Sequence, residues 1–204
     1  RESDFSVVYP LARGTGPLFA VVGAIVVLGE APSLLGWVGI FAILAGILLI
    51  SGTTQRLATS SSKVRSGLTW GTLTGLSIAA YTLIDGWAVK VLGISPVLYY
   101  LIGLALRTAI LALQALRNPP GLLSQWRVNA RYIVAVGVLS PLAYTLVLFA
   151  MTMAPLSYVA PVRELSMLVG VLFGAKLLRE SFIPSRLIGT ACMVAGIIAL
   201  ARAQ

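Results

Sequence analysis

Apolar stretches of about twenty residues follow one another along nearly the whole chain, with short polar segments between them. They lie at residues 8–28, 34–51, 67–89, 96–116, 131–150, 157–178 and 184–201. A helix of roughly 20 apolar residues crosses the hydrocarbon core of a bilayer. Charged residues make up only 10% of the chain, against about one quarter in soluble domains. Alternating ten-residue strands, which a membrane barrel requires, are absent. We therefore predict an all-α polytopic membrane protein with about seven transmembrane helices.

The segment 13–51 is repeated later in the chain at a fixed offset of 150 residues, without an insertion or deletion. The matching positions include an arginine, an acid and two glycines. They are Arg13, Glu30, Gly39 and Gly46, which return as Arg163, Glu180, Gly189 and Gly196. An internal duplication in an apolar chain is typical of secondary transporters.

The duplication predicts how the chain is organised. Residues 67–204 form a complete unit of five helices, and residues 1–51 contain only the last two helices of an earlier unit, joined by a Ser/Thr-rich linker at 52–66. About three helices are therefore expected before Arg1, giving ten in all. Because each unit has an odd number of helices, the two units should run in opposite directions through the membrane, as an inverted repeat.

The connections between the helices are also predicted. Tight turns follow Glu30, at 31–33, and Glu180, at 181–184, so each final helix pair should form a hairpin. The longest loop of the second unit is expected between Arg117 and Arg131.

The net charge of +9 comes mainly from basic residues in the polar segments between spans, so it does not indicate nucleic-acid binding. Ten of these residues fall on one side of the membrane and two on the other, which predicts that the first side is cytoplasmic and the C-terminus external. The chain has one cysteine, Cys192, and no histidine. This excludes an internal disulfide and argues against a zinc, haem or copper site, so no cofactor or metal is expected.

The segments YPLARGTGPLFAVVGAIVVLGE and APVRELSMLVGVLFGAKLLRE, each followed by a second apolar helix, resemble the fourth and ninth helices of the drug/metabolite transporter superfamily, EamA-like branch. The most specific parts are the acid that ends one helix and the glycine nine residues later, present in both copies. The resemblance implies ten helices in two inverted repeats, transport of small metabolites or drugs, and no covalent cofactor. Both termini of that family are usually drawn in the cytoplasm, whereas the charge bias places this C-terminus outside.

Charged residues inside the spans are the first candidates for a solute pathway, because a charge near the bilayer centre is costly. They are Arg13, Asp85, Arg107, Arg163 and Glu164. Asp85 and Arg163 lie at similar depths from one membrane face, so we expect them to pair, either as a structural ion pair or as part of the pathway. Arg107 lies near the middle of its span without an acid at matching depth. It is expected to bind an anionic solute or, alternatively, backbone carbonyls.

Other features of the spans complete the prediction. The segment 13–17 (RGTGP) should weaken its helix and free backbone groups, whereas its copy at 163–167 (RELSM) has no such break. Aromatic walls for a drug-like solute are expected from Tyr81, Trp87 and Tyr144. Glu30 and Glu180 are expected to bind backbone amides in loops, and stripes of small residues, such as Gly16 with Ala20 and Gly71 with Gly75, to allow close helix packing.

The function predicted from the sequence is a secondary carrier, working as an exporter, in a bacterial inner membrane. Its partners would be a small-molecule solute and membrane lipid, with a homodimer left open. A membrane scaffold or sensor that transports nothing is the alternative. An enzyme is disfavoured because the spans offer neither a histidine nor a paired set of acids.

Overall fold

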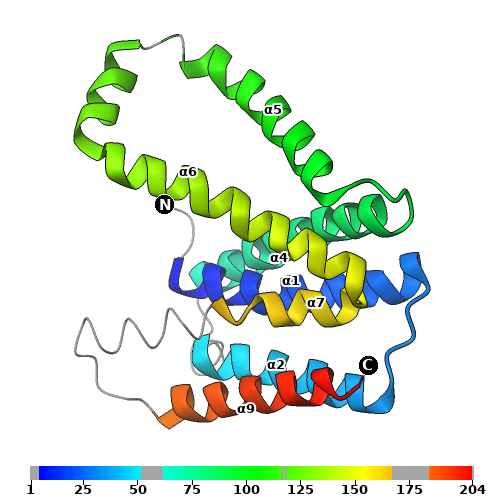
Figure 1. Cartoon of the computed structure of the whole chain (residues 1–204). Coiled ribbons are helices and arrows are strands. Elements are labelled where there is room, and N and C mark those ends of the chain that lie inside the picture. Colours follow the sequence, from blue (N-terminus) through cyan, green and yellow to red (C-terminus); the bar gives the residue numbers. More distant parts are fainter. Residues whose placement is uncertain (1–4, 52–61, 116, 118, 167–183, 204) are drawn as a thin grey trace. The chain divides into compact units, whose positions relative to one another are not determined.

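The structure, a computed structural model, describes residues 5–51, 62–115, 117, 119–166 and 184–203. These residues form helices and no strands (Figure 1). The helices are α1 (Phe5–Leu28), α2 (Leu34–Ser51), α4 (Ser62–Lys90), α5 (Pro96–Ala115), α6 (Pro119–Met153), α7 (Leu156–Arg163) and α9 (Pro184–Ala201). The chain divides into two compact units, residues 1–85 with 154–204 and residues 86–153, which we describe separately. The all-helical class is as predicted.

The first unit begins with the expected hairpin of α1 and α2. Gly29 ends α1 with a φ of +67°, a left-handed conformation that glycine adopts without strain. The Ser33 hydroxyl then accepts a hydrogen bond of 3.1 Å from the Gly36 amide and so caps the start of α2. The tight turn predicted after Glu30 is therefore confirmed.

The duplicated glycines bring α2 and α9 together. The two helices lie side by side and antiparallel in Figure 1, and Gly39 faces Gly196 while Gly46 faces Gly189. A methyl group on Gly39 would lie 2.8 Å from the Gly196 carbonyl oxygen, and one on Gly46 would lie 2.5 Å from the Gly189 oxygen. No side chain fits at either crossing. Beside the glycines, a buried apolar core of the same two helices completes the contact, including Ile40, Ile43, Ile47, Met193 and Leu200.

The small residues of α1 also pack as predicted. Ala20 and Ala24 are fully buried, and Gly16 lies against α4, where a methyl group on Gly75 would come 3.0 Å from the Gly16 amide nitrogen. In a membrane, such close backbone approaches are a principal source of helix association, because lipid provides no hydrophobic drive between helices.

The predicted helix break lies in the other copy of the repeat. Helix α1 continues without interruption through 13–17, whereas α7 ends at Arg163 and is followed by a turn at Glu164 and Leu165. The glycines do not break α1 because they are used for packing: methyl groups at Gly14 and Gly16 would meet Leu48 and Ile78 at 3.3 and 3.1 Å. Tertiary contact thus overrides the low helix propensity of glycine.

The span expected at 157–178 is described only to residue 166. Helix α7 starts at Leu156, and its remainder lies outside the described residues, as does Glu180 with the turn at 181–184. The linker expected at 52–66 is helical from Ser62, where α4 begins, and its earlier residues are likewise outside the described part.

The second unit is a hairpin of α5 and α6. Tyr100 and Tyr144 connect the two helices, with ring centroids 5.7 Å apart. The prediction of a loop between Arg117 and Arg131 is wrong, because most of this segment is helical and α6 already begins at Pro119. Proline favours the first position of a helix, where its missing N–H has no partner to lose, and the polar residues that follow are compatible with a helix that extends beyond an apolar span.

Two helices of the described part are long and apolar enough to cross a membrane, at Pro96–Leu113 and Ser124–Met153. Three further apolar helices are shorter, at Arg13–Leu28, Leu34–Ile50 and Leu187–Ala201. The composition and these helices agree with a membrane protein.

Candidate functional site

An ion pair joins the two copies of the repeat inside the first unit. Arg13, on α1, donates from Nη1 to Glu164 Oε2 at 2.7 Å. Glu164 follows the last residue of α7, and its side chain is 8% exposed, whereas that of Arg13 is 30% exposed. A short charge-assisted hydrogen bond with a nearly buried carboxylate is among the stronger polar contacts in a protein. Helices α1 and α7 are therefore held together at this point by charge.

Arg163, the repeat copy of Arg13, has different contacts. Its Nη1 donates to Thr82 Oγ1 on α4 at 3.3 Å, and its Nε lies 3.9 Å from Glu164 Oε1. Its guanidinium carbon lies 5.8 Å from the centre of the Tyr81 ring, within the range of a cation–π contact. Glu164 thus stands between two arginines that occupy equivalent positions of the duplication. We call Arg13, Glu164 and Arg163 the charge cluster.

Asp85 is not the partner of Arg163, contrary to the expectation from sequence. Among the described residues, the polar partners of Arg163 are Thr82 and Glu164. Asp85 is itself buried and lies one helical turn beyond Thr82 on α4. Depth along the membrane normal cannot distinguish neighbouring turns of a helix, and the estimate also assumed that Arg163 lay inside a continuous span. Thr82 was missed for this reason, although Tyr81 beside it was among the candidates.

The remaining candidates belong to the second unit. Arg107 and Trp87 are exposed, and Tyr144 packs against Tyr100. The anion-binding role predicted for Arg107 and the aromatic walls predicted for Trp87 and Tyr144 stay predictions.

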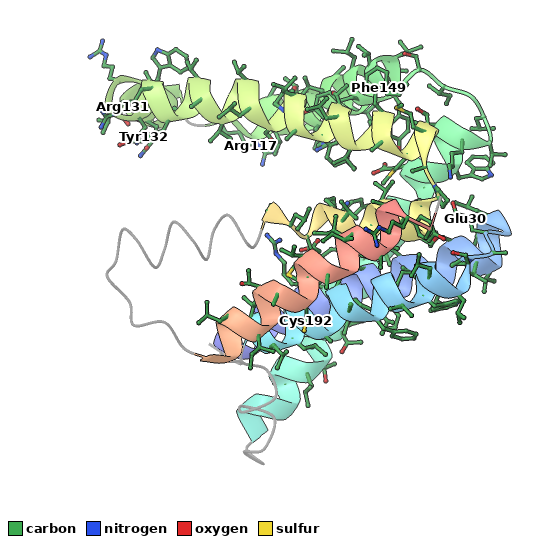
Figure 2. The ribbon with its side chains drawn as sticks, turned by 60° about the horizontal axis from the view of Figure 1, so that its bottom comes forward. Glu30, Arg117, Arg131, Tyr132, Phe149 and Cys192 are labelled. Carbon is green, nitrogen blue, oxygen red and sulfur yellow. The ribbon has the colours of Figure 1, made fainter. Side chains whose placement is uncertain are left out.

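Glu30 binds backbone amides, as expected, and the amides are those of another helix. The Leu156 and Ser157 N–H groups donate to its two carboxylate oxygens at 2.7 and 2.8 Å. Figure 2 shows Glu30 at the end of the hairpin formed by α1 and α2. These are the first two amides of α7, which have no partner within their own helix. The carboxylate satisfies both of them and also meets the positive end of the helix dipole.

A second polar contact lies at the same end of the unit and was not foreseen from the sequence. The hydroxyl of Tyr158, a residue that is 5% exposed, accepts a hydrogen bond of 3.3 Å from the Ser33 amide. Gly36 lies directly against the Tyr158 ring, where a side chain would collide with it. Tyrosine within an apolar span is common enough that sequence alone gives no reason to single this one out.

The part of the chain that the structure describes contains no group of three His, Cys, Asp or Glu side chains that could hold a metal ion. Cys192, labelled in Figure 2, is a half-buried free cysteine on α9.

The apolar composition and the apolar helices point to a helical integral membrane protein. The model of the EamA-like transporter family matches residues 65–202, which is more than half of the chain. The chain belongs to the EamA-like transporter family. Neither a curated protein nor a solved structure matches it.

Proposed function

We propose that this chain forms part of a secondary carrier that exports small metabolites or drug-like solutes from a bacterial cell by alternating access between two inverted repeats. Membership of a transporter family supports a carrier. The solute class, the direction of transport and the bacterial inner membrane are the finer parts of the proposal.

The glycine crossings of α2 and α9 support the inverted repeat. Gly39 meets Gly196, and Gly46 meets Gly189, so each residue contacts the copy of the other. Such reciprocal contacts are what a two-fold axis between antiparallel copies produces. A two-fold axis in the membrane plane relates a state open to one side of the bilayer to a state open to the other side, with equivalent contacts in each.

The observation that carries the proposal is the charge cluster. It lies between helices that are equivalent in the duplication, so a movement of one repeat against the other changes the distance between Arg13 and Glu164 directly. A charge inside a membrane bundle is expensive to keep, and function is the usual reason to find one there. An ion pair at the contact of the two repeats can open when a solute supplies a substitute partner.

A flux experiment tests this function. Purified protein in proteoliposomes should accumulate or release labelled solute from a metabolite panel faster than empty vesicles. Arg13→Gln should lower that rate by at least about tenfold, because it removes the cluster's shortest contact. Arg131→Gln is the matched control, since Arg131 is exposed on α6 and contacts the neighbouring Tyr132. Arg107→Ala in the same assay tests the separate role predicted for Arg107.

A membrane scaffold or sensor remains the second candidate, because a buried ion pair can also lock a bundle that carries nothing. Full-length, well-folded protein that moves no solute of the panel in either direction would favour that alternative. An equal flux in Arg13→Gln and wild type would remove the charge cluster from the mechanism while leaving the carrier.

A further inference from the structure

The guanidinium of Arg163 is under-bonded for its burial. Its side chain is 19% exposed, and its one hydrogen bond among the described residues is the 3.3 Å contact to Thr82. A guanidinium has five N–H donors, and donors left without an acceptor in a low-dielectric site cost free energy. The adjacent Glu164 does not satisfy them, because its carboxylate is bound at 2.7 Å to Arg13 and lies 3.9 Å from Arg163.

Thr82 and Tyr81 hold the Arg163 guanidinium in place, and the ion pair with Glu164 is long, at 3.9 Å. Thr82 is fully buried and donates its hydroxyl proton to the Ile78 carbonyl at 2.7 Å, so its oxygen is fixed as an acceptor. The Tyr81 ring faces the same guanidinium. A fork of fixed N–H donors beside an aromatic face suits a ligand that combines a carboxylate with an apolar body.

The duplication explains why the described residues offer Arg163 no closer carboxylate. Arg13 and Arg163 are copies of one another, but the copy of Glu164 is Gly14, which has no side chain. In the part of the chain that the structure describes, the two equivalent arginines therefore both lie beside the Glu164 carboxylate. The other acid near the cluster, Asp85, lies one turn beyond Thr82, so the two arginines carry no excess of positive charge over the two acids. An anion would therefore be recognised by the geometry of the Arg163 N–H donors.

We propose that Arg163 binds the carboxylate of an amphipathic organic anion while Glu164 stays paired with Arg13. This assignment rests on the carrier function proposed above and specifies its solute class. Because Glu164 Oε1 lies 3.9 Å from Arg163 Nε, its negative charge opposes the binding of a second carboxylate to Arg163.

Benzoate serves as the probe, with benzamide as its neutral isostere, benzylamine as a cation and inorganic phosphate as an anion without an apolar body. The measurement is the rise in the midpoint of thermal unfolding of purified protein in an uncharged detergent, as a function of probe concentration. We expect benzoate to raise the midpoint and the other three to have little effect. A response to benzylamine as large as that to benzoate, or tighter binding of phosphate, would overturn the carboxylate site.

The variants separate the two roles. Arg163→Gln should weaken benzoate binding by at least about tenfold, and Arg163→Lys should fall between it and the wild type because lysine keeps the charge but loses the fork. Glu164→Gln should tighten binding by about tenfold, since it removes a negative charge that lies 3.9 Å from Arg163 Nε and repels the bound carboxylate. The double variant Arg163→Gln/Glu164→Gln should bind as weakly as Arg163→Gln, which excludes binding to the Arg13 that Glu164→Gln releases. Weaker binding in Glu164→Gln, or an unchanged affinity in Arg163→Gln, would overturn the proposal.

If the Arg163 variants show no unfolding transition, the carboxylate site is tested with Glu164→Gln and Tyr81→Leu instead. Tyr81→Leu should weaken benzoate more than acetate, because only benzoate uses the ring, and equal losses would overturn the site. The carrier function and the carboxylate site are contradicted by different outcomes. A protein that binds benzoate through Arg163 but moves no solute contradicts the carrier, whereas one that moves solute without inhibition by benzoate contradicts only the carboxylate site.

Discussion

The two halves of the duplication agree closely in one helix pair and differ in the other. Helices α2 and α9 use their glycines in the same way, each copy facing the other across a crossing too narrow for a side chain. Helices α1 and α7 do not match: α1 passes through Arg13 as a continuous helix, whereas α7 ends at Arg163. A backbone crossing requires glycine on both sides, so both copies carry it. A charge pair between copies needs only one acid, so the copies are free to diverge there.

The first prediction tests the glycine crossings of α2 and α9 by placing a large side chain in one of them. Gly46→Leu should remove about 3 kcal/mol from the free energy of unfolding, because its Cβ alone would lie 2.5 Å from the Gly189 carbonyl oxygen and the opposing backbone cannot retreat without separating α2 from α9. Thermal unfolding in detergent measures the loss. Gly137→Leu is the control, since an added Cβ at Gly137 meets nothing within 4 Å. Equal losses in the two variants would mean that the crossing is not a tight contact.

A second prediction measures the coupling across the divergent pair. Arg13→Gln and Glu164→Gln should each cost about 2–3 kcal/mol, because each strands a partly buried partner, and the double variant should cost less than the sum. The same cycle on Asp85→Asn and Arg163→Gln should give the smaller coupling energy, since Arg163 contacts Thr82 and Glu164 instead. A larger coupling for Asp85 with Arg163 would restore the pairing expected from sequence.

Third, the amide contacts of Glu30 can be removed without filling any space. Glu30→Ala should lower the free energy of unfolding by about 1–3 kcal/mol, because two buried amides of α7 lose their acceptors. Glu30→Gln keeps one oxygen acceptor and should lose roughly half as much. The pair of variants is compared by chemical or thermal unfolding, and an unchanged stability in Glu30→Ala would show that water replaces the carboxylate.

The smallest effect is expected at the Tyr158 hydroxyl. Its contacts to the Ser33 amide and hydroxyl are long, at 3.3 and 3.5 Å, so Tyr158→Phe should cost about 0.5–1 kcal/mol. Phenylalanine keeps the ring against Gly36 and therefore isolates the hydroxyl. A loss as large as that of Glu30→Ala would indicate that the hydroxyl, and not the carboxylate, is the main polar link at this end.

Features that depend on local residue types were predictable from the sequence. The turn after Glu30 follows from a run of Gly, Ala, Pro and Ser, and the close packing of Gly16 and Gly75 follows from their small size in an apolar helix. The amide-binding role of Glu30 was foreseen, but the identity of the amides was not. They belong to residues 126 and 127 positions away, and no local pattern encodes that distance.

Features that depend on how helices are rotated about their axes were not predictable. The depth of Asp85 in its span gave no information on which turn of α4 faces Arg163, and Thr82 occupies that place. Similarly, the glycines at 14 and 16 read as a helix break, because propensity takes no account of the neighbours that pack against them. The long start of α6 was missed because a polar segment with two prolines is typical of a loop, although a proline at the first position also starts a helix.

The contacts at the two ends of α7 together restrict how this helix can move. At its start, Glu30 joins it to the end of α1 through two hydrogen bonds, and beyond its last residue Glu164 joins it to the middle of α1 through one ion pair. With eight residues, α7 is about 12 Å long and too short to bend appreciably between these attachments. The Glu30 carboxylate binds two backbone amides that open only if the start of α7 unfolds or separates, whereas the Arg13–Glu164 contact joins two side chains that can exchange partners without moving a backbone. We therefore expect the end of α7 at the charge cluster to separate from α1 more readily than the end at Glu30.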